Sequence, residues 1–413
     1  MQSNSMVAGT TQSATPGDGK QMKIPIAKPF FDGSEIPGIE RVLKSGWVTQ
    51  GPAVEQFETS FKNYVGVEHA VAVSNCTTGM HTIWLALGIG KNDEVICPSY
   101  SFIASANAVR HAGAEPCFAD IDPHTLNLDI ASTRNLIEQN YDSSLTNKKT
   151  KRKLKAILLV HQIGIPGDIE AFEQLAKEYG IHLVEDAACA IGSEYKSAKI
   201  GSSGNLCAFS FHPRKVITTG EGGMVTTGNS ALADSLRVYR AHGMSVSDLA
   251  RHQSASTTFE KYEVVGYNYR MTDMQASLGS SQLLLLESIL SKRGEIANQF
   301  ISAFKEIGGL CTIETPNYCT RWNYQSFPVR LINKTADQRN EMMNHLQEKG
   351  ITTRRGIPPI HLEPVYEQGL HLKNTEEVSQ TSLFLPIYPQ LSQNEIDYII
   401  ESVKAAYKIV DQS

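Results

Sequence analysis

From Ile24 to about residue 290, short apolar runs alternate with segments of helical periodicity. The apolar runs are predicted strands and span 70–74, 93–99, 115–121, 155–162, 181–188 and 206–211. The segments predicted as helices span 77–89, 101–113 and 168–180, and the last two end at glycines. Strands that alternate with helices are typical of a largely parallel sheet with helices on both faces. We therefore predict an α/β fold for this part of the chain.

The pattern changes after about residue 290. It predicts a long linking helix over 288–308, a strand over 326–332, a helix over 336–350, an extended segment over 351–357 and a closing helix over 392–410. These elements indicate a smaller α+β domain. The first 22 residues are rich in Ser, Thr, Gly and Gln, which favours disorder. We therefore predict a disordered tail (1–22), a large α/β domain (23–287), and a linking helix with a small C-terminal α+β domain (288–413).

The composition narrows the class of protein. The chain has 413 residues, of which 41% are hydrophobic and 20% charged, as in ordinary soluble globular proteins. A net charge of -5 provides no argument for a nucleic-acid partner. No apolar run approaches the roughly 20 residues of a membrane span, so we expect no membrane association. The seven cysteines are scattered and form no C-x-x-C pair, which predicts no metal site and a reducing, cytoplasmic location.

One basic segment, residues 140–153, has two interpretations. It is either an anion-binding patch or a solvated surface loop before the strand at 155–162. Isolated runs of charge usually only interact with solvent, so the surface loop is the favoured interpretation.

A single lysine, Lys215, stands at the end of the predicted strand in the segment F-S-F-H-P-R-K-V-I-T-T-G-E-G-G (209–223). A phosphate-binding loop of the Walker type is excluded, because there the glycines precede the lysine. A partly buried lysine suits Schiff-base chemistry instead: the amine must be neutral to attack a carbonyl, and burial lowers its pKa. Pyridoxal 5'-phosphate (PLP) is the usual carbonyl partner of such a lysine.

PLP makes further demands, and the sequence has a candidate for each. Asp186 ends a predicted strand, where ligands gather in open parallel sheets, and its carboxylate suits the pyridine nitrogen. The segment S-N-C-T-T-G (74–79) joins a strand to a helix and suits the phosphate, to which Ser210 can add a hydroxyl. Phe102 begins a predicted helix and can cover the ring face.

At this point the chain resembles the DegT/DnrJ/EryC1/StrS family of PLP-dependent sugar aminotransferases, within fold type I of PLP enzymes. The resemblance covers residues 24–410, and its motifs run in family order. They are S-G-W-V-T-Q-G-P (45–52), S-N-C-T-T-G-M-H (74–81), D-E-V-I-C-P-S-Y-S-F (93–102), V-E-D-A-A (184–188), S-F-H-P-R-K-V-I-T-T-G-E-G-G (210–223) and G-Y-N-Y-R-M-T-D (266–273). Fold type I implies a mostly parallel central sheet covered by helices, plus a smaller C-terminal α+β domain.

The resemblance implies a role for each candidate residue. Lys215 would form the Schiff base with PLP, and Asp186 would pair with the pyridine nitrogen. The predicted phosphate ligands share a hydroxyl group and are Thr77, Thr78 and Ser210.

Three more positions are assigned by the resemblance. Phe102 would lie on the ring face. Asn268 would reach the phosphate bound by a neighbouring subunit, which implies a homodimer with active sites shared across the interface. Cys189 stands where the family often has Gln or His to bind the phenolic oxygen of the cofactor, and a thiol is a weaker donor.

The function implied by the resemblance is transfer of an amino group from L-glutamate to a nucleotide-linked keto sugar. The motifs S-G-W-V and T-T-G-E-G-G-M-V favour a 4-keto-6-deoxy sugar, made for a surface polysaccharide. Alternatives are an aminotransferase for cyclitols or other keto substrates, and a PLP-binding regulator without turnover. Related sugar dehydratases have His in place of the lysine, so Lys215 argues against that branch.

Plain structural roles remain open for several of these residues. Asp186 can cap a helix or join a structural ion pair, Phe102 can belong to the core, and Asn268 can hydrogen-bond within a loop. Thr77 and Thr78 can act as simple N-caps. His361 either touches substrate or is a buried structural histidine. Adjacent residues of an extended chain point opposite ways, so at most one of Arg354 and Arg355 is expected to meet a diphosphate.

Overall fold

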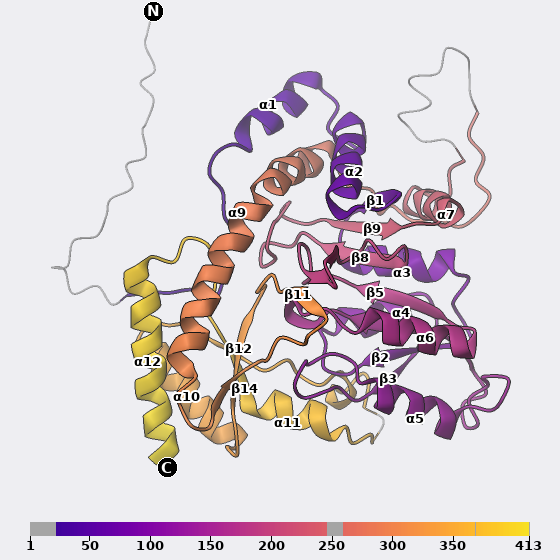
Figure 1. The fold of residues 1–413 in the computed structure, drawn as a ribbon. Coiled ribbons are helices and arrows are strands. Elements are labelled where there is room, and N and C mark those ends of the chain that lie inside the picture. The colour runs from indigo at the N-terminus through magenta and orange to yellow at the C-terminus, as the bar shows by residue number, and fades with distance from the viewer. Residues whose placement is uncertain (1–21, 246–258, 368, 413) are drawn as a thin grey trace, which may run out of the picture.

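A seven-stranded sheet forms the centre of the molecule in the computed structural model, which describes residues 22–245, 259–367 and 369–412 (Figure 1). The predicted disordered tail lies outside the described residues except for Met22. The strand order is β1-β9-β8-β5-β4-β2-β3. The strands are β1 (His69–Val73), β2 (Asp93–Pro98), β3 (Glu115–Ala119), β4 (Lys153–Val160), β5 (His182–Asp186), β8 (Leu206–Ser210) and β9 (Gly223–Thr227).

The sheet is mostly parallel, as predicted. The neighbours from β8 to β3 pair in parallel, whereas β9 runs antiparallel to both β1 and β8. Every strand predicted before residue 290 is present. Strand β9 was not predicted, because its sequence G-M-V-T-T is short and follows directly on glycines that are typical of a turn.

Helices cover both faces of this sheet. The helices on one face are α2 (Pro52–Val65), α5 (Ile130–Asn140), α6 (Ile169–Tyr179) and α9 (Asp273–Phe304), and those on the other are α3 (Cys76–Ala86), α4 (Ala104–His111) and α7 (Ser230–Arg240). Alternate residues of each strand enter the two apolar cores, for example Ala70 and Ala72 on the α2 face and Val71 and Val73 on the α3 face. Figure 1 shows this sheet between its two helix layers and confirms the predicted α/β fold.

The C-terminal part contains an antiparallel sheet in the order β10-β12-β14-β13, as predicted for an α+β region. Its strands are β10 (Leu310–Thr312), β12 (Phe327–Leu331), β13 (Arg354–Arg355) and β14 (Ser382–Leu385), and its helices are α10 (Ala336–Glu348), α11 (Lys373–Thr381) and α12 (Gln393–Gln412). The small sheet and its helices enclose an apolar core of their own. Ile24, near the start of the described chain, is buried in this core and forms a β-bridge with Ile351. The domain boundary at residue 287 remains a prediction.

The remaining elements are short or peripheral. They are α1 (Ile36–Ser45), a three-stranded sheet of β6 (Glu194–Tyr195), β7 (Ala198–Lys199) and β11 (Cys319–Arg321), and the 3-10 turns η1 (Gln162–Gly164) and η2 (Ile360–Leu362). Within the described ranges, no helix combines the length and the apolar character needed to cross a membrane.

The basic segment 140–153 is attached to the fold through a buried carboxylate. Tyr141, Asn147 and Thr150 donate hydrogen bonds of 2.6, 2.9 and 2.6 Å to Glu94 of β2. The ammonium group of Lys148 donates to main-chain carbonyls at the end of α5. The segment lies outside the cavity described below, so the structure favours the surface-loop interpretation.

The long helix α9 begins well before the predicted start at residue 288. Thr272 and Gln275 form a capping box that starts the helix. Asp273, the first residue of α9 after its N-cap Thr272, is 3% exposed. Its side chain caps a different helix, α2. Its carboxylate accepts hydrogen bonds from three main-chain N–H groups, those of Gly51 (2.8 Å), Ala53 (3.1 Å) and Val54 (3.0 Å).

We therefore expect Asp273→Ala to destabilise the fold. Three N–H groups at a helix start would lose a charged acceptor in a buried site, which costs about 2 to 4 kcal/mol. The loss is measured as a lower urea midpoint, followed by circular dichroism. Asp337→Ala is the matched control, because Asp337 occupies the first turn of α10 but is exposed. A midpoint for Asp273→Ala equal to that of the control would contradict the capping role.

Candidate active site

A cavity of about 960 Å³ opens at the carboxyl ends of the parallel strands. It is lined by the start of α3, the β2–α4 connection, the end of β5, the β8–β9 connection and part of the small sheet. The predicted site residues that line it are Thr77, Thr78, Phe102, Asp186, Cys189, Ser210 and Lys215. Residues separated by more than one hundred positions therefore meet in one cavity, as the PLP hypothesis requires.

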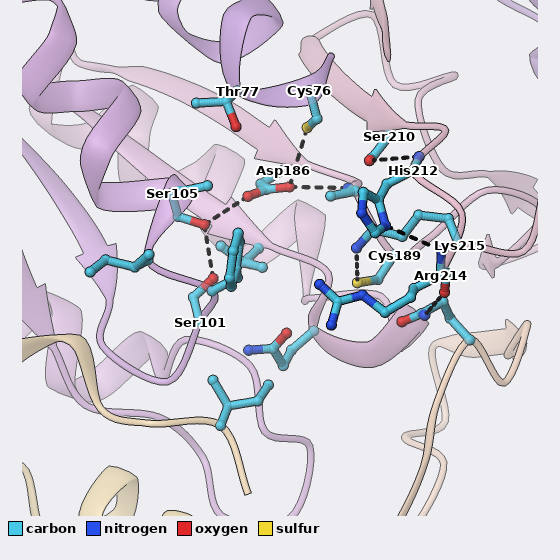
Figure 2. Close-up of a pocket in the computed structure, with 18 of the residues that line it drawn as sticks. Cys76, Thr77, Ser101, Ser105, Asp186, Cys189, Ser210, His212, Arg214 and Lys215 are labelled. Carbon is cyan, nitrogen blue, oxygen red and sulfur yellow. Dashed lines mark hydrogen bonds between the residues drawn. The ribbon is translucent and has the colours of Figure 1, made fainter. Parts of the chain in front are cut away.

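Lys215 lies on the connection between β8 and β9, a hairpin rather than a strand-to-helix turn. Its Nζ atom lies 3.2 Å from the Sγ atom of Cys189 (Figure 2). Gly220, further along the same connection, has φ = 82°, a left-handed conformation that favours glycine. The chain thus returns to the sheet as β9 directly after it has placed the lysine in the cavity.

Two features of its surroundings act in opposite directions on the pKa of the Lys215 amine. Burial lowers the pKa, as we expected from the sequence. The neighbouring Cys189 thiol raises it, with smaller contributions from Cys76 and Asp186, and the net pKa is above its usual value. The expectation of a lowered pKa is therefore corrected for the cofactor-free site, because Cys189, Cys76 and Asp186 together outweigh the effect of burial.

Asp186 is buried at the end of β5, and its carboxylate is held by neutral donors. Ser105 donates to Oδ2 at 2.8 Å, and the main-chain N–H of Ala188 donates to Oδ1 at 3.0 Å. Ser101 lies 2.8 Å from Ser105 and extends this chain of hydroxyls (Figure 2). Among the described residues, Asp186 has no ion-pair partner within 4.0 Å. A buried carboxylate without a cation is costly, so the site favours a ligand with a positively charged group here.

A second carboxylate, Glu185, is buried behind Asp186. Its Oε2 atom lies 2.9 Å from Nε2 of His161, and Nδ1 of His161 accepts from the N–H of Gly167 at 3.0 Å. Nε2 therefore has the proton and donates it. Burial raises the pKa of Glu185, but hydrogen bonds from His161 and other neighbours outweigh burial and lower it overall. This pair holds the end of β5 in place and does not face the cavity.

The start of α3 has the geometry of an anion site. Asn75 is the N-cap, and the hydroxyl of Thr78 completes the capping box by accepting from the N–H of Asn75 at 3.2 Å; it also donates to the Asn75 carbonyl at 2.8 Å. The N-cap role that we left open for Thr77 and Thr78 therefore belongs to Asn75, and Thr78 contributes to the cap from the third position of the helix. In the described part of the chain, no hydrogen bond engages the hydroxyl of Thr77, which lines the cavity. Of the two threonines, Thr77 is the better candidate for a phosphate ligand, and both assignments remain predictions.

Close packing brings the Lys215 connection against this helix start. A Cβ atom on Gly223, the first residue of β9, would lie 2.6 Å from the main-chain carbon of Asn75 and 2.7 Å from the nitrogen of Cys76. Only glycine permits this approach. The N-terminus of α3 and the lysine are therefore placed on the same cavity by direct main-chain contact.

Phe102 and Ser210 line the cavity with accessible side chains. Phe102 is 69% exposed, which excludes the interpretation as a core residue. Ser210 accepts a hydrogen bond of 3.4 Å from the N–H of His212, so its own proton is available to a ligand. Their contacts with ring and phosphate remain predictions.

Asn268 differs from the other predicted residues. Its side chain is exposed, its main chain bridges Ala241, and in the described structure it does not line the cavity of its own chain. A role at its own site is therefore not favoured, whereas a role at a neighbouring subunit stays a prediction.

His361 is a structural residue. It is fully buried, Ser99 lies 2.6 Å from its Nδ1 atom, and Glu376 lies 3.1 Å from its Nε2 atom. Both ring nitrogens are used, and the residue joins the end of β2 to α11. The alternative role in substrate contact is not supported.

Sequence reasoning missed the residues that support Asp186. Ser101 and Ser105 were passed over because serines near a helix start are common and are usually interpreted as caps. Their spacing of four residues, which places both on one face, was the available signal. Arg214 was also missed, although it directly precedes Lys215 and lines the cavity.

The residues present fit PLP. The buried Asp186 carboxylate has only neutral donors and suits a protonated ring nitrogen, the helix start suits a phosphate, and the Lys215 amine faces the same cavity. In the described part of the chain, no group of three or more His, Cys, Asp or Glu side chains could hold a metal ion.

The chain matches known proteins over nearly its whole length. Residues 31–404 match the model of the DegT/DnrJ/EryC1/StrS aminotransferase family. The spore coat polysaccharide biosynthesis protein SpsC of Bacillus subtilis is 36% identical, over 94% of this chain and 98% of SpsC. The GDP-perosamine synthase of Escherichia coli O157:H7 is 35% identical, over 93% and 98%. The PLP form of Spr1654 from Streptococcus pneumoniae has a TM-score of 0.83 at 26% identity, over 94% and 100%.

The Cys189 contact leads to a prediction on pH dependence. In Cys189→Ala the largest influence that raises the pKa of Lys215 is gone, so the amine becomes neutral at lower pH. Only the neutral amine attacks an aldehyde, so the pH profile for the rate of PLP uptake by cofactor-free protein should move to lower pH. The rate is followed by visible absorption. Cys311→Ser, at an exposed cysteine of the small sheet, is the control. An unmoved profile in Cys189→Ala would show that the thiol does not influence the amine.

Proposed function

Because the chain belongs to the DegT/DnrJ/EryC1/StrS aminotransferase family, we propose that it transfers the amino group of L-glutamate to a nucleotide-linked keto sugar. The family's aminotransferases depend on PLP, and neighbouring structures contain it. A relative named GDP-perosamine synthase favours a nucleotide-linked 4-keto-6-deoxy acceptor, in line with the motifs above. The name of SpsC supports a product for polysaccharide biosynthesis.

One observation carries the proposal. The amine of Lys215, the buried carboxylate of Asp186 and the N-terminus of α3 face a single cavity of about 960 Å³. This volume lies at the upper end of the range for small-molecule sites, so it has room for a cofactor and part of a substrate.

When bound, PLP supplies an aldehyde that condenses with amines and a protonated ring that withdraws electrons from the carbon next to the nitrogen. Asp186 would hold the proton on the ring nitrogen, while Ser105 and the N–H of Ala188 keep the carboxylate oriented. Lys215 would hold the aldehyde carbon through Nζ. Once a substrate amine replaces it there, the free amine of Lys215 would remove the proton from the α-carbon of the donor. In the second half-reaction it would deliver a proton to the sugar carbon that gains the amine.

Other residues would bind the phosphate of PLP and cover the face of its ring. Thr77, Ser210 and main-chain N–H groups at the start of α3 would bind the phosphate. Phe102, which is exposed at the cavity edge, would cover the ring face and exclude water.

A homodimer is part of the proposal. Large apolar side chains are exposed on α1, on α9 and on the segment before Asn268, namely Ile36 (66%), Leu43 (59%), Tyr262 (60%), Val265 (85%) and Leu284 (87%). Contiguous apolar patches mark surfaces that another chain covers, and Ile36, Leu43 and Leu284 belong to helices α1 and α9, which pack against each other. Asn268 would then reach the phosphate in the partner's cavity.

The test of the function is the visible spectrum of the purified protein with PLP, before and after L-glutamate without any sugar. We expect the band of bound PLP to disappear as the amino form of the cofactor accumulates, and to return when a nucleotide-linked keto sugar is added. A band that ignores every amino donor would favour the non-catalytic regulator instead.

Lys215→Ala should bind PLP without a covalent link and lose amino transfer by about 10³-fold or more, because its proton-transfer group is absent. Single-turnover absorption with L-glutamate measures the loss. Lys91→Ala, at an exposed lysine outside the cavity, should behave as the wild type. Normal turnover by Lys215→Ala would refute the assigned role.

Subunit mixing tests the shared site. Asn268→Ala should bind PLP about tenfold or more weakly, because it loses a charge-assisted hydrogen bond to phosphate. If Asn268 serves the partner's site, mixing this variant with Lys215→Ala places both defects in one site and leaves the other intact. Statistical mixing then restores roughly a quarter of wild-type activity. If Asn268 serves its own site, the mixture gains nothing.

A further inference from the structure

Three arginine side chains line the cavity without an internal partner. Arg214 directly precedes Lys215, and Arg354 and Arg355 form strand β13. All three are exposed. Among the ion pairs within 4.0 Å that the described residues form, none includes these arginines, whereas Arg321 and Arg330 each have a glutamate. Cations that face a cavity without a carboxylate partner favour a ligand of negative charge.

The two arginines of β13 lie on opposite faces of the small sheet. Strand register places Arg354 beside Phe384, and Arg355 beside Leu383. Phe384 belongs to the apolar cluster under the cavity, together with Tyr100, whereas Leu383 is fully buried in the core of the small sheet. Cross-strand partners share a face, so Arg354 projects on the Phe384 side of the sheet, next to the apolar cluster under the cavity, and Arg355 projects on the Leu383 side.

Electrostatic coupling supports this arrangement. Burial lowers the pKa of Arg354, and the charge of Arg214 lowers it further. Burial likewise lowers the pKa of Arg339 in α10, with a contribution from Arg355. The charge of Arg354 therefore interacts with that of Arg214, the arginine beside Lys215. The charge of Arg355 interacts instead with that of Arg339 in helix α10 of the small domain.

The carboxylates that line the cavity do not neutralise the charges of Arg214 and Arg354. Asp186 is bound by Ser105 and Ala188. The Oε1 atom of Glu221 lies 4.0 Å from Nε2 of His212. Glu363 also lines the cavity, but in the described structure it makes no ion pair with either arginine. The positive charge of Arg214 and Arg354 is therefore available to bind an anionic ligand.

We propose that Arg214 and Arg354 form an anion subsite beside Lys215 that binds an anionic oxygen group of the substrate. The proposal rests on the proposed function and adds to it the place where substrate charge is bound. A guanidinium presents a planar pair of donors, which matches the oxygens of a carboxylate or a phosphate. Because one arginine comes from the β8–β9 connection and the other from the small sheet, a bound anion would also link these two parts of the molecule.

Two substrates can supply this chemistry: the amino donor has carboxylates, and the nucleotide-linked sugar has a diphosphate. Direct binding to the PLP-loaded enzyme separates them. Glutarate, an unreactive dicarboxylate, represents the donor, and GDP and UDP represent the nucleotide. Isothermal titration gives the Kd of each probe for the wild type, Arg214→Ala and Arg354→Ala.

We expect each substitution to weaken at least one probe by about 10- to 100-fold, the range for a lost charge-assisted hydrogen bond. If glutarate binds more weakly and the nucleotides bind as before, the subsite binds the donor carboxylate. If the nucleotides bind more weakly and glutarate binds as before, the subsite binds the diphosphate. Losses for both show that one arginine pair serves the two half-reactions in turn. Arg354→Lys, which keeps the charge but not the planar donor pair, should show a smaller loss.

Arg355→Ala is the matched comparison, because it removes the same charge from the neighbouring residue, which also lines the cavity but pairs in register with Leu383 rather than with Phe384. Equal losses in Arg355→Ala and Arg354→Ala would show only a general field effect and would overturn the proposal. So would unchanged binding in both Arg214→Ala and Arg354→Ala, or a wild type that binds none of the probes. Failure of the proposed function is a separate result, since it appears as a PLP band that does not respond to L-glutamate.

Discussion

A buried carboxylate is the constraint on which the site depends. Asp186 lies at the end of β5 with serine and main-chain donors but, among the described residues, without an ion-pair partner. Hydrogen bonds from neutral groups orient a buried charge, yet they do not replace the solvation that it has lost. A cationic ring placed against this carboxylate would be stabilised, and the carboxylate would in turn keep the ring protonated. The serine pair and the His161–Glu185 pair behind β5 both serve to hold this one group in position.

The second constraint is steric. The start of α3 and the β8–β9 hairpin touch through main-chain atoms at Gly223, where a side chain has no space. This contact holds the start of α3, the proposed phosphate site, against the end of the connection that carries Lys215 eight residues earlier. The antiparallel strand β9 is therefore part of the active-site geometry and not only an addition to the sheet.

Charge divides the cavity into two parts. Near the sheet, Lys215, Cys189, Asp186 and the helix start match the groups of a cofactor. Toward the small sheet, Arg214 and Arg354 provide positive charge that has no ion-pair partner among the described residues. Such a division would suit the two proposed substrates, which differ in shape but both carry negative charge.

The sequence by itself determined the alternation of strands and helices, the α+β character of the C-terminal part, and seven of the residues that meet in the cavity, namely Thr77, Thr78, Phe102, Asp186, Cys189, Ser210 and Lys215. These are local properties: periodicity, turn residues and motifs of unlike residues at short spacing. Only the tertiary structure decided that Thr78 is occupied by capping while Thr77 is accessible, that Cys189 contacts Lys215, and that Arg354 projects on the Phe384 side of its sheet. Strand β9 and the early start of α9 also belong to this group, since β9 depends on pairing with a strand more than one hundred residues away, and Asp273 caps a helix more than two hundred residues away. Contacts of this kind have no signature in a local window, because the free energy that selects them comes from packing between distant segments.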